Sequence, residues 1–122
     1  MANGMPKMPD DDFLRKIASM FDLFHKGPGL KVTKGKLASD LRTNTRLIEL
    51  AVFELRRRGS PILADGEGYW LAESPAEFEP VLRSLKHRLT QIHGTLQALE
   101  SARAALVRQV EVEPNGQRRL AF

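Results

Sequence analysis

The sequence predicts a mainly α-helical fold that contains one small β-hairpin and ends in a long helix. Three observations support this prediction: apolar residues at helical spacing in the first half of the chain, a glycine-rich turn between two short apolar runs, and a leucine repeat after residue 80. The 122 residues suffice for one compact domain and an appendage. We divide the chain into a flexible tail (1–10), a globular domain (11–73), a long helix (74–110) and a short hairpin or frayed tail (111–122).

The first helix is expected directly after three aspartates, Asp10 to Asp12, which supply an N-cap and negative charge at the positive end of the helix dipole. The sequence HKGPG at 25–29 ends it through glycine and proline. LKVT at 30–33 is a candidate for a short strand. The apolar stripe expected to be buried consists of Phe13, Leu14, Ile17, Met20, Phe21 and Phe24.

Two more helices follow, and the link between them is short. Thr33 is suited to cap a helix over 34–41, and Asn44 to cap one that runs to about residue 58, where Gly59 ends it. The core face of this third helix is expected to be Leu47, Ile48, Ala51, Val52 and Leu55.

The hairpin is predicted from PILAD and YWLA, which flank a Gly-Glu-Gly turn between residues 61 and 72. Ser74, Pro75 and Glu77 then provide the N-cap, the first helical position and the capping box of the last helix. Pro80 is expected to kink or restart that helix within its first two turns.

After Pro80 the apolar residues alternate spacings of three and four, which is the a/d pattern of a coiled coil over four heptads. A single helix cannot bury such a seam, so the sequence predicts a homodimer through this helix. Arg103 stands at an a position, where a polar residue sets register or strand number at some cost in stability. The alternative is that the helix packs back on the first helix of its own chain. The residues assigned to oligomerisation are Leu82, Leu85, Leu89, Ile92, Leu96, Leu99 and Leu106.

Charge is strongly segregated along the chain, and this is more informative than the net charge of +4. Residues 13–60 carry eleven Lys or Arg against four Asp or Glu, a balance of +7, whereas residues 61–82 carry five acids and no Lys or Arg. A basic stretch of this kind is typical of nucleic-acid binding. The alternative is an ordinary solvated helix surface.

Several classes of protein are not expected from the composition. The chain has no cysteine and three histidines far apart in sequence, so we expect no disulfide, no metal site and no cofactor. No convergent acid–base set and no phosphate-binding glycine loop points to an enzyme. The absence of a long apolar stretch and of a signal-like start predicts a cytoplasmic protein that does not enter a membrane.

The run LASDLRTNTRLIELAVFEL (37–55) resembles the helix-turn-helix of winged-helix DNA-binding domains. LRRRGSPILADGEGYWLA (55–72) resembles the end of the recognition helix and the wing that follows it. The N-terminal domain of the biotin repressor and small phage or prophage regulators have this arrangement. The resemblance covers roughly residues 11–73 and implies a winged helix followed by a long C-terminal coiled-coil helix.

The resemblance also implies a set of contacts with double-stranded DNA. At the front of the recognition helix, Arg46 would pair with guanine, Asn44 with phosphate or adenine, and Glu49 with the N4 amine of cytosine. Thr45 lies among them. The expected phosphate contacts around this helix are Lys31, Lys34, Lys36 and Arg42.

This sequence departs from the family pattern at three places. Arg42 stands where the turn usually has glycine, and the wing tip (65–68) is acidic and would repel phosphate. Leu50, Phe53 and the acid Glu54 occupy positions that are often polar or basic and exposed in the family. Leu50, Phe53 and Trp70 would form an apolar surface suited to a protein partner if they are exposed. We expect instead that the long helix covers them.

Two functions of different classes follow from these observations. The first is a dimeric DNA-binding protein, a transcription or replication regulator of phage type, in which the coiled coil places two recognition helices on related half-sites. The second is a protein-interaction adaptor, for example on a polymerase or replisome, that uses the winged helix as a scaffold. A packaging subunit similar to a small terminase is a narrower third option.

Overall fold

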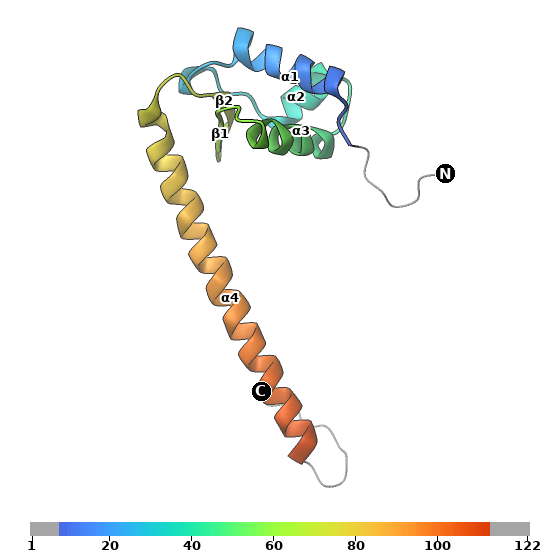
Figure 1. Ribbon diagram of the computed structural model, residues 1–122, viewed down its shortest axis with the longest axis vertical. Helices are drawn as coiled ribbons and strands as arrows, with labels where there is room; N and C mark the ends of the chain where they lie inside the picture. The colour runs from blue at the N-terminus through green and yellow to red at the C-terminus, as the bar shows by residue number, and fades with distance from the viewer. Residues whose placement is uncertain (1–7, 113–122) are drawn as a thin grey trace, which may run out of the picture. The chain divides into compact units, whose positions relative to one another are not determined.

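The computed structural model describes residues 8–112 and confirms a mainly helical fold with a small hairpin and a long C-terminal helix (Figure 1). It divides into two compact units at the bond between Val81 and Leu82. The first seven residues of the predicted N-terminal tail, and residues 113–122 of the predicted terminal hairpin or tail, lie outside the described residues. Within residues 8–112, no helix has the length and apolar character needed to cross a bilayer.

Helix α1 (Asp11–Phe24) begins as predicted, with the Asp10 carboxylate accepting a hydrogen bond from the Phe13 amide at 2.9 Å. The apolar stripe is narrower than predicted. Phe24 is 60% exposed, because it lies in the last turn and packs edge-on against His25 instead of entering the core. Phe13 and Met20 lie at the margin of the core, and the buried residues of the helix are Leu14, Ile17 and Phe21.

The predicted strand at 30–33 does not form. A short 3-10 helix, η1 (Pro28–Leu30), is followed by a single antiparallel bridge, in which Val32 and Tyr69 exchange backbone hydrogen bonds of 2.9 and 2.8 Å. Gly68 makes this approach possible, because a Cβ at that position would lie 2.6 Å from the Val32 carbonyl oxygen. The segment is therefore held beside the hairpin without extending the sheet.

Helix α2 (Lys34–Asp40) and helix α3 (Thr45–Arg57) begin at the predicted caps. The Thr33 hydroxyl accepts from the Lys36 amide at 3.0 Å, and the Asn44 side-chain oxygen accepts from the Leu47 amide at 2.8 Å. Gly59, with φ of 99°, follows the end of α3 in the conformation that glycine adopts without strain.

The apolar face of α3 forms the centre of the core, as the periodicity predicted. Ile48 and Ala51 are fully buried, and Val52 is nearly so. This face packs against α1 and α2, and Val32 and Ile62 join the same apolar cluster. The cluster consists of Leu14, Ile17, Phe21, Val32, Leu37, Ala38, Ile48, Ala51, Val52, Leu55 and Ile62.

The hairpin pairs β1 (Ile62–Asp65) with β2 (Gly68–Leu71) in antiparallel register, with Leu63 opposite Trp70. Trp70 is only 4% exposed, so it is covered, as expected, and does not belong to the exposed partner surface that was the alternative. Leu63 and Val81 are buried with it in a second cluster, against which Phe78 also packs.

Glu77 ties the first turn after the hairpin to this tryptophan. One of its carboxylate oxygens accepts from the Trp70 indole nitrogen at 2.8 Å, and the other accepts from the Ser74 amide at 2.7 Å in the predicted capping box. The N-terminal unit consequently extends to Val81, beyond the boundary expected after residue 73.

Helix α4 (Phe78–Val112) follows the 3-10 helix η2 (Pro75–Glu77). The restart expected at Pro80 occurs at Phe78, where the 3-10 helix gives way to α-helix. Pro80 itself lies in the first turn of α4, where its missing amide hydrogen is not required. The helix is uninterrupted over its whole length of 35 residues.

Trp70 and Phe53 are expected to differ sharply in their contribution to stability. Trp70→Ala should lower the free energy of unfolding by about 3–5 kcal/mol, because it removes a buried aromatic side chain and leaves a cavity. Phe53 is 61% exposed, so Phe53→Ala should change it by less than about 0.5 kcal/mol. Urea unfolding followed by circular dichroism measures both, and equal losses would show that Phe53 is covered after all.

Candidate nucleic-acid interface

The turn between α2 and α3 is tightly hydrogen-bonded, and it fixes where α3 begins. The Leu41 amide donates to the Leu37 carbonyl at 3.0 Å, and the Thr43 amide to the Ala38 carbonyl at 2.9 Å. Arg42 adopts a left-handed conformation with φ of 54°, which only glycine adopts without strain. Here the strained position is occupied by a cation that lies beside the first turn of α3.

The front of α3 presents Thr45 and Arg46 to solvent, and the Arg46 side chain is 67% exposed. Asn44 is the N-cap of α3, as the sequence predicted. Its side-chain oxygen accepts a hydrogen bond from the Leu47 amide at 2.8 Å. Asn44 positions the helix and has its amide nitrogen left for a phosphate.

Lys34, Arg46 and Glu49 are brought together at the front of α3. The Lys34 ammonium lies 2.6 Å from one Glu49 oxygen, and the Arg46 guanidinium lies 3.7 Å from the other. The hydrogen bond from Lys34 lowers the pKa of Glu49, and the same bond raises the pKa of Lys34. Glu49 is therefore an occupied acceptor, and the cluster as a whole retains one positive charge.

Lys31 pairs with the acidic side chains of the hairpin tip. Its ammonium lies 2.6 Å from Asp65 and 2.9 Å from Glu67, and it stands 5.0 Å from the centre of the Trp70 ring. These bonds partly neutralise the acidic tip that was expected to repel DNA. The opposite charges of segments 13–60 and 61–82 were the sequence signal for this contact, although the partners could not be paired from that signal alone.

The remaining predicted cations differ in their surroundings. Lys36 pairs with Asp40 at 2.9 Å, one turn along α2. Arg42 is exposed and forms no ion pair within the described part of the chain. Arg42 and Arg46 are thus the two predicted contacts whose charge is least compensated.

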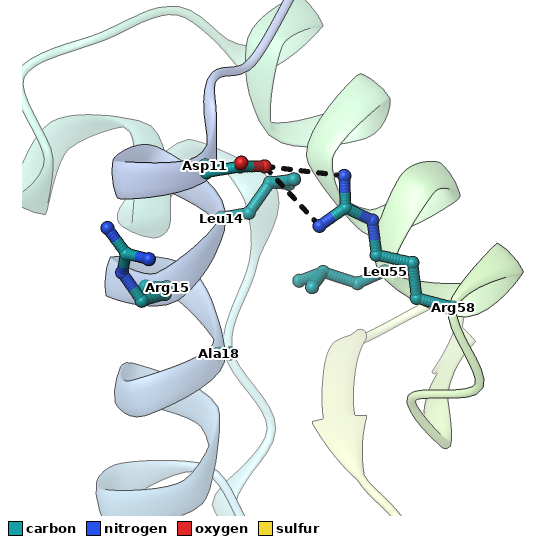
Figure 2. Close-up of a pocket in the computed structure, with 6 residues that line it drawn as sticks. All are labelled: Asp11, Leu14, Arg15, Ala18, Leu55 and Arg58. Carbon is teal, nitrogen blue, oxygen red and sulfur yellow. Dashed lines mark hydrogen bonds and ion pairs between the residues drawn. The ribbon is translucent and has the colours of Figure 1, made fainter.

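The triplet Arg56 to Arg58 stabilises the far end of α3. The Arg56 Nε donates to the Ile62 carbonyl at 2.8 Å, and partial burial lowers the pKa of this guanidinium. Arg58 reaches Glu54 at 3.0 Å and Asp11 at 3.4 Å. Figure 2 shows this side chain spanning from α3 to the start of α1, above a shallow groove that Leu14 and Leu55 line.

Two large apolar side chains, Leu50 and Phe53, follow Arg46 along α3 and are at least partly accessible to solvent. Phe53 is exposed, Leu50 is half-buried, and the Arg57 guanidinium stands 6.0 Å from the centre of the Phe53 ring. The start of α4 covers Trp70, whereas Phe53 stays exposed.

No family model, curated protein or solved structure matches this chain. No group of three or more potential metal ligands occurs among residues 8–112. The inference of a function therefore rests on the side chains described above and on the order of the elements.

The ion pair between Lys31 and Asp65 predicts a defined pH dependence. The hydrogen bond from Lys31 holds the pKa of Asp65 below its ordinary value of 3.8. A carboxyl with a depressed pKa stabilises the fold above its unfolded pKa, and this contribution is lost as the pH falls through the folded pKa. Asp65→Asn removes the negative charge but keeps a side-chain oxygen that can accept the hydrogen bond from the Glu67 amide in the turn.

The melting temperature of Asp65→Asn should therefore lie below that of the wild type at pH 7, and the difference should shrink as the pH falls below about 4. Calorimetry of both proteins between pH 7 and pH 2 measures this. A difference that persists unchanged at pH 2 would mean that the charge of Asp65 does not contribute.

Proposed function

We propose that this protein is a dimeric winged-helix protein that binds double-stranded DNA, of the kind that regulates phage or prophage transcription or replication. The observation that supports this most directly is the exposed, capped front of α3, where Arg46 and Thr45 face solvent beside Arg42. A helix that follows a short turn and presents its first residues in this way suits the major groove.

The role proposed for each residue follows from its exposure and from the ion pairs that it forms in the structure. Arg46 is the base-reading residue, because its guanidinium is exposed and only distantly paired with Glu49, at 3.7 Å. Arg42 contacts a phosphate next to the turn. Lys34 and Lys36 contact phosphates after leaving their partners Glu49 and Asp40. Because these ion pairs must first be broken, each lysine contributes less to DNA affinity than an unpaired cation would.

Glu49 has a restraining role in this proposal. Its carboxylate holds Lys34 and faces Arg46, so it lowers the attraction of the α3 front for any phosphate backbone. Binding to an arbitrary sequence is thereby weakened more than binding to a site that Arg46 recognises, which favours discrimination between sequences.

The first test compares Arg46→Ala with Arg57→Ala, a matched control on the same helix. The two side chains are similarly exposed, at 67% and 69%, but Arg57 lies at the far end of α3. Arg46→Ala should cost about 1–3 kcal/mol on a duplex selected from a random pool and little on other duplexes. Arg57→Ala should change both affinities only slightly. Fluorescence anisotropy at several salt concentrations provides the measurement.

The absence of duplex binding by the wild type at low salt would exclude this function. In that case the exposed Phe53 and the half-buried Leu50 favour the adaptor, in which α3 binds a protein partner. The adaptor would require Phe53→Ala to fold as stably as the wild type and to lose a partner that the wild type retains.

The second test removes the charge of Glu49. Glu49→Gln keeps the size of the side chain and frees Lys34, so affinity for all duplexes should rise several-fold. The slope of log affinity against log salt should steepen, since each additional phosphate neutralised releases about 0.9 of a counterion.

Asp22→Asn is the matched control for this variant. It removes an acid that pairs with Lys26 at 3.2 Å on α1, away from the front of α3. It should leave the affinity and its salt dependence almost unchanged. An equal gain in both variants would show that the effect arises from net charge and not from the interface.

A further inference from the structure

The C-terminal unit carries an apolar seam that lies exposed along α4. From Leu82 to Val110, the leucine, isoleucine and valine side chains at its a and d positions are between 42% and 66% exposed. They recur at the 3.5-residue repeat that one helix offers to another. These apolar side chains can be buried only by a partner, and a second copy of α4 has the same repeat.

The charges on and beside the seam oppose a parallel arrangement of two copies. In a parallel pair each a residue faces itself, so the two Arg103 guanidiniums would meet inside the seam. Beside the seam, Arg88 at a g position would face His93 at an e position of the second copy, so no ion pair with a carboxylate would form there. The first three a residues are leucine, whereas parallel dimers favour β-branched side chains there.

An antiparallel arrangement removes these conflicts and adds favourable contacts. With Leu82 of one copy against Leu106 of the other, every a or d residue between them has a partner, including Leu89 with Leu99 and Ile92 with Leu96. Each Arg103 then faces Leu85 near an end of the seam, and the two guanidiniums lie about 27 Å apart along the axis.

The flanking charges fit the same register. Lys86 and Glu100 both occupy e positions, and e faces e in an antiparallel pair. Lys86 of each copy consequently lies next to Glu100 of the other. The antiparallel dimer therefore contains two such ion pairs.

We propose that α4 pairs in antiparallel orientation with α4 of a second copy, with Leu82 of each helix against Leu106 of the other. This rests on the homodimer of the proposed function and specifies its geometry. The two points at which the N-terminal units join the pair then lie roughly 36 Å apart. A parallel pair would bring those points side by side.

Single cysteines test this arrangement, since the chain has none of its own. In the proposed register His93 lies near the centre, and its e position faces itself across the pair. His93→Cys should therefore form an intermolecular disulfide under mild oxidation, at least tenfold faster than Arg103→Cys. Gly94→Cys, at the adjacent outward f position, is the control and should cross-link as slowly as Arg103→Cys.

A charge exchange provides the second test. Lys86→Glu and Glu100→Lys should each weaken association, because each places like charges together, and the two changes in one chain should restore it. Analytical ultracentrifugation of the wild type should show the mass of two chains of 13.7 kDa.

Fast cross-linking of Arg103→Cys, or failure of the double exchange to restore association, would overturn the antiparallel arrangement. A wild-type mass other than that of two chains would overturn the pairing itself. These measurements contain no DNA, so their outcome is independent of whether the N-terminal unit binds a duplex.

Discussion

The packing of the apolar face of α3 against α1 and α2 is the interaction on which the rest of the N-terminal unit depends. Ile17, Phe21 and Ile48 are completely buried at this contact. Burying each such side chain contributes about 1.5–3 kcal/mol relative to exposure. Because a helix has 3.6 residues per turn, orienting this face inward also determines which residues of α3 point to solvent. The exposure of Arg46 and Phe53 is thus a consequence of where the core lies.

Ion pairs between distant segments refine the surface that this packing creates. Lys31 bridges to the acidic hairpin tip, and Arg58 bridges to the start of α1. Exposed pairs of this kind contribute little to stability. Their larger effect is on the surface charge, because the carboxylates offset the positive charges of Lys31 and Arg58. Arg42 and Arg46 are then the less compensated positive charges near the front of α3.

The two units use apolar surface in different ways. The N-terminal unit buries its apolar residues within itself, and the first turn of α4 completes it by covering Trp70. The C-terminal unit exposes a regular seam of apolar residues at the a/d spacing of a coiled coil. In the proposed protein, recognition and association are separate properties of separate units, so each can be removed by mutation without the other.

The sequence alone was sufficient for the features that depend on near neighbours. The caps at Asp10, Thr33 and Asn44, the buried face of α3 and the positions of both strands follow from hydrogen bonds within three or four residues and from simple periodicity. Tertiary structure decided the features that join residues far apart in the chain. It buried Trp70 beneath Phe78 and Val81, and it paired Lys31 with Asp65 and Lys34 with Glu49. Periodicity shows which side of an element is apolar, but it does not show which distant side chain will lie opposite, because that depends on how the packed elements are placed in space.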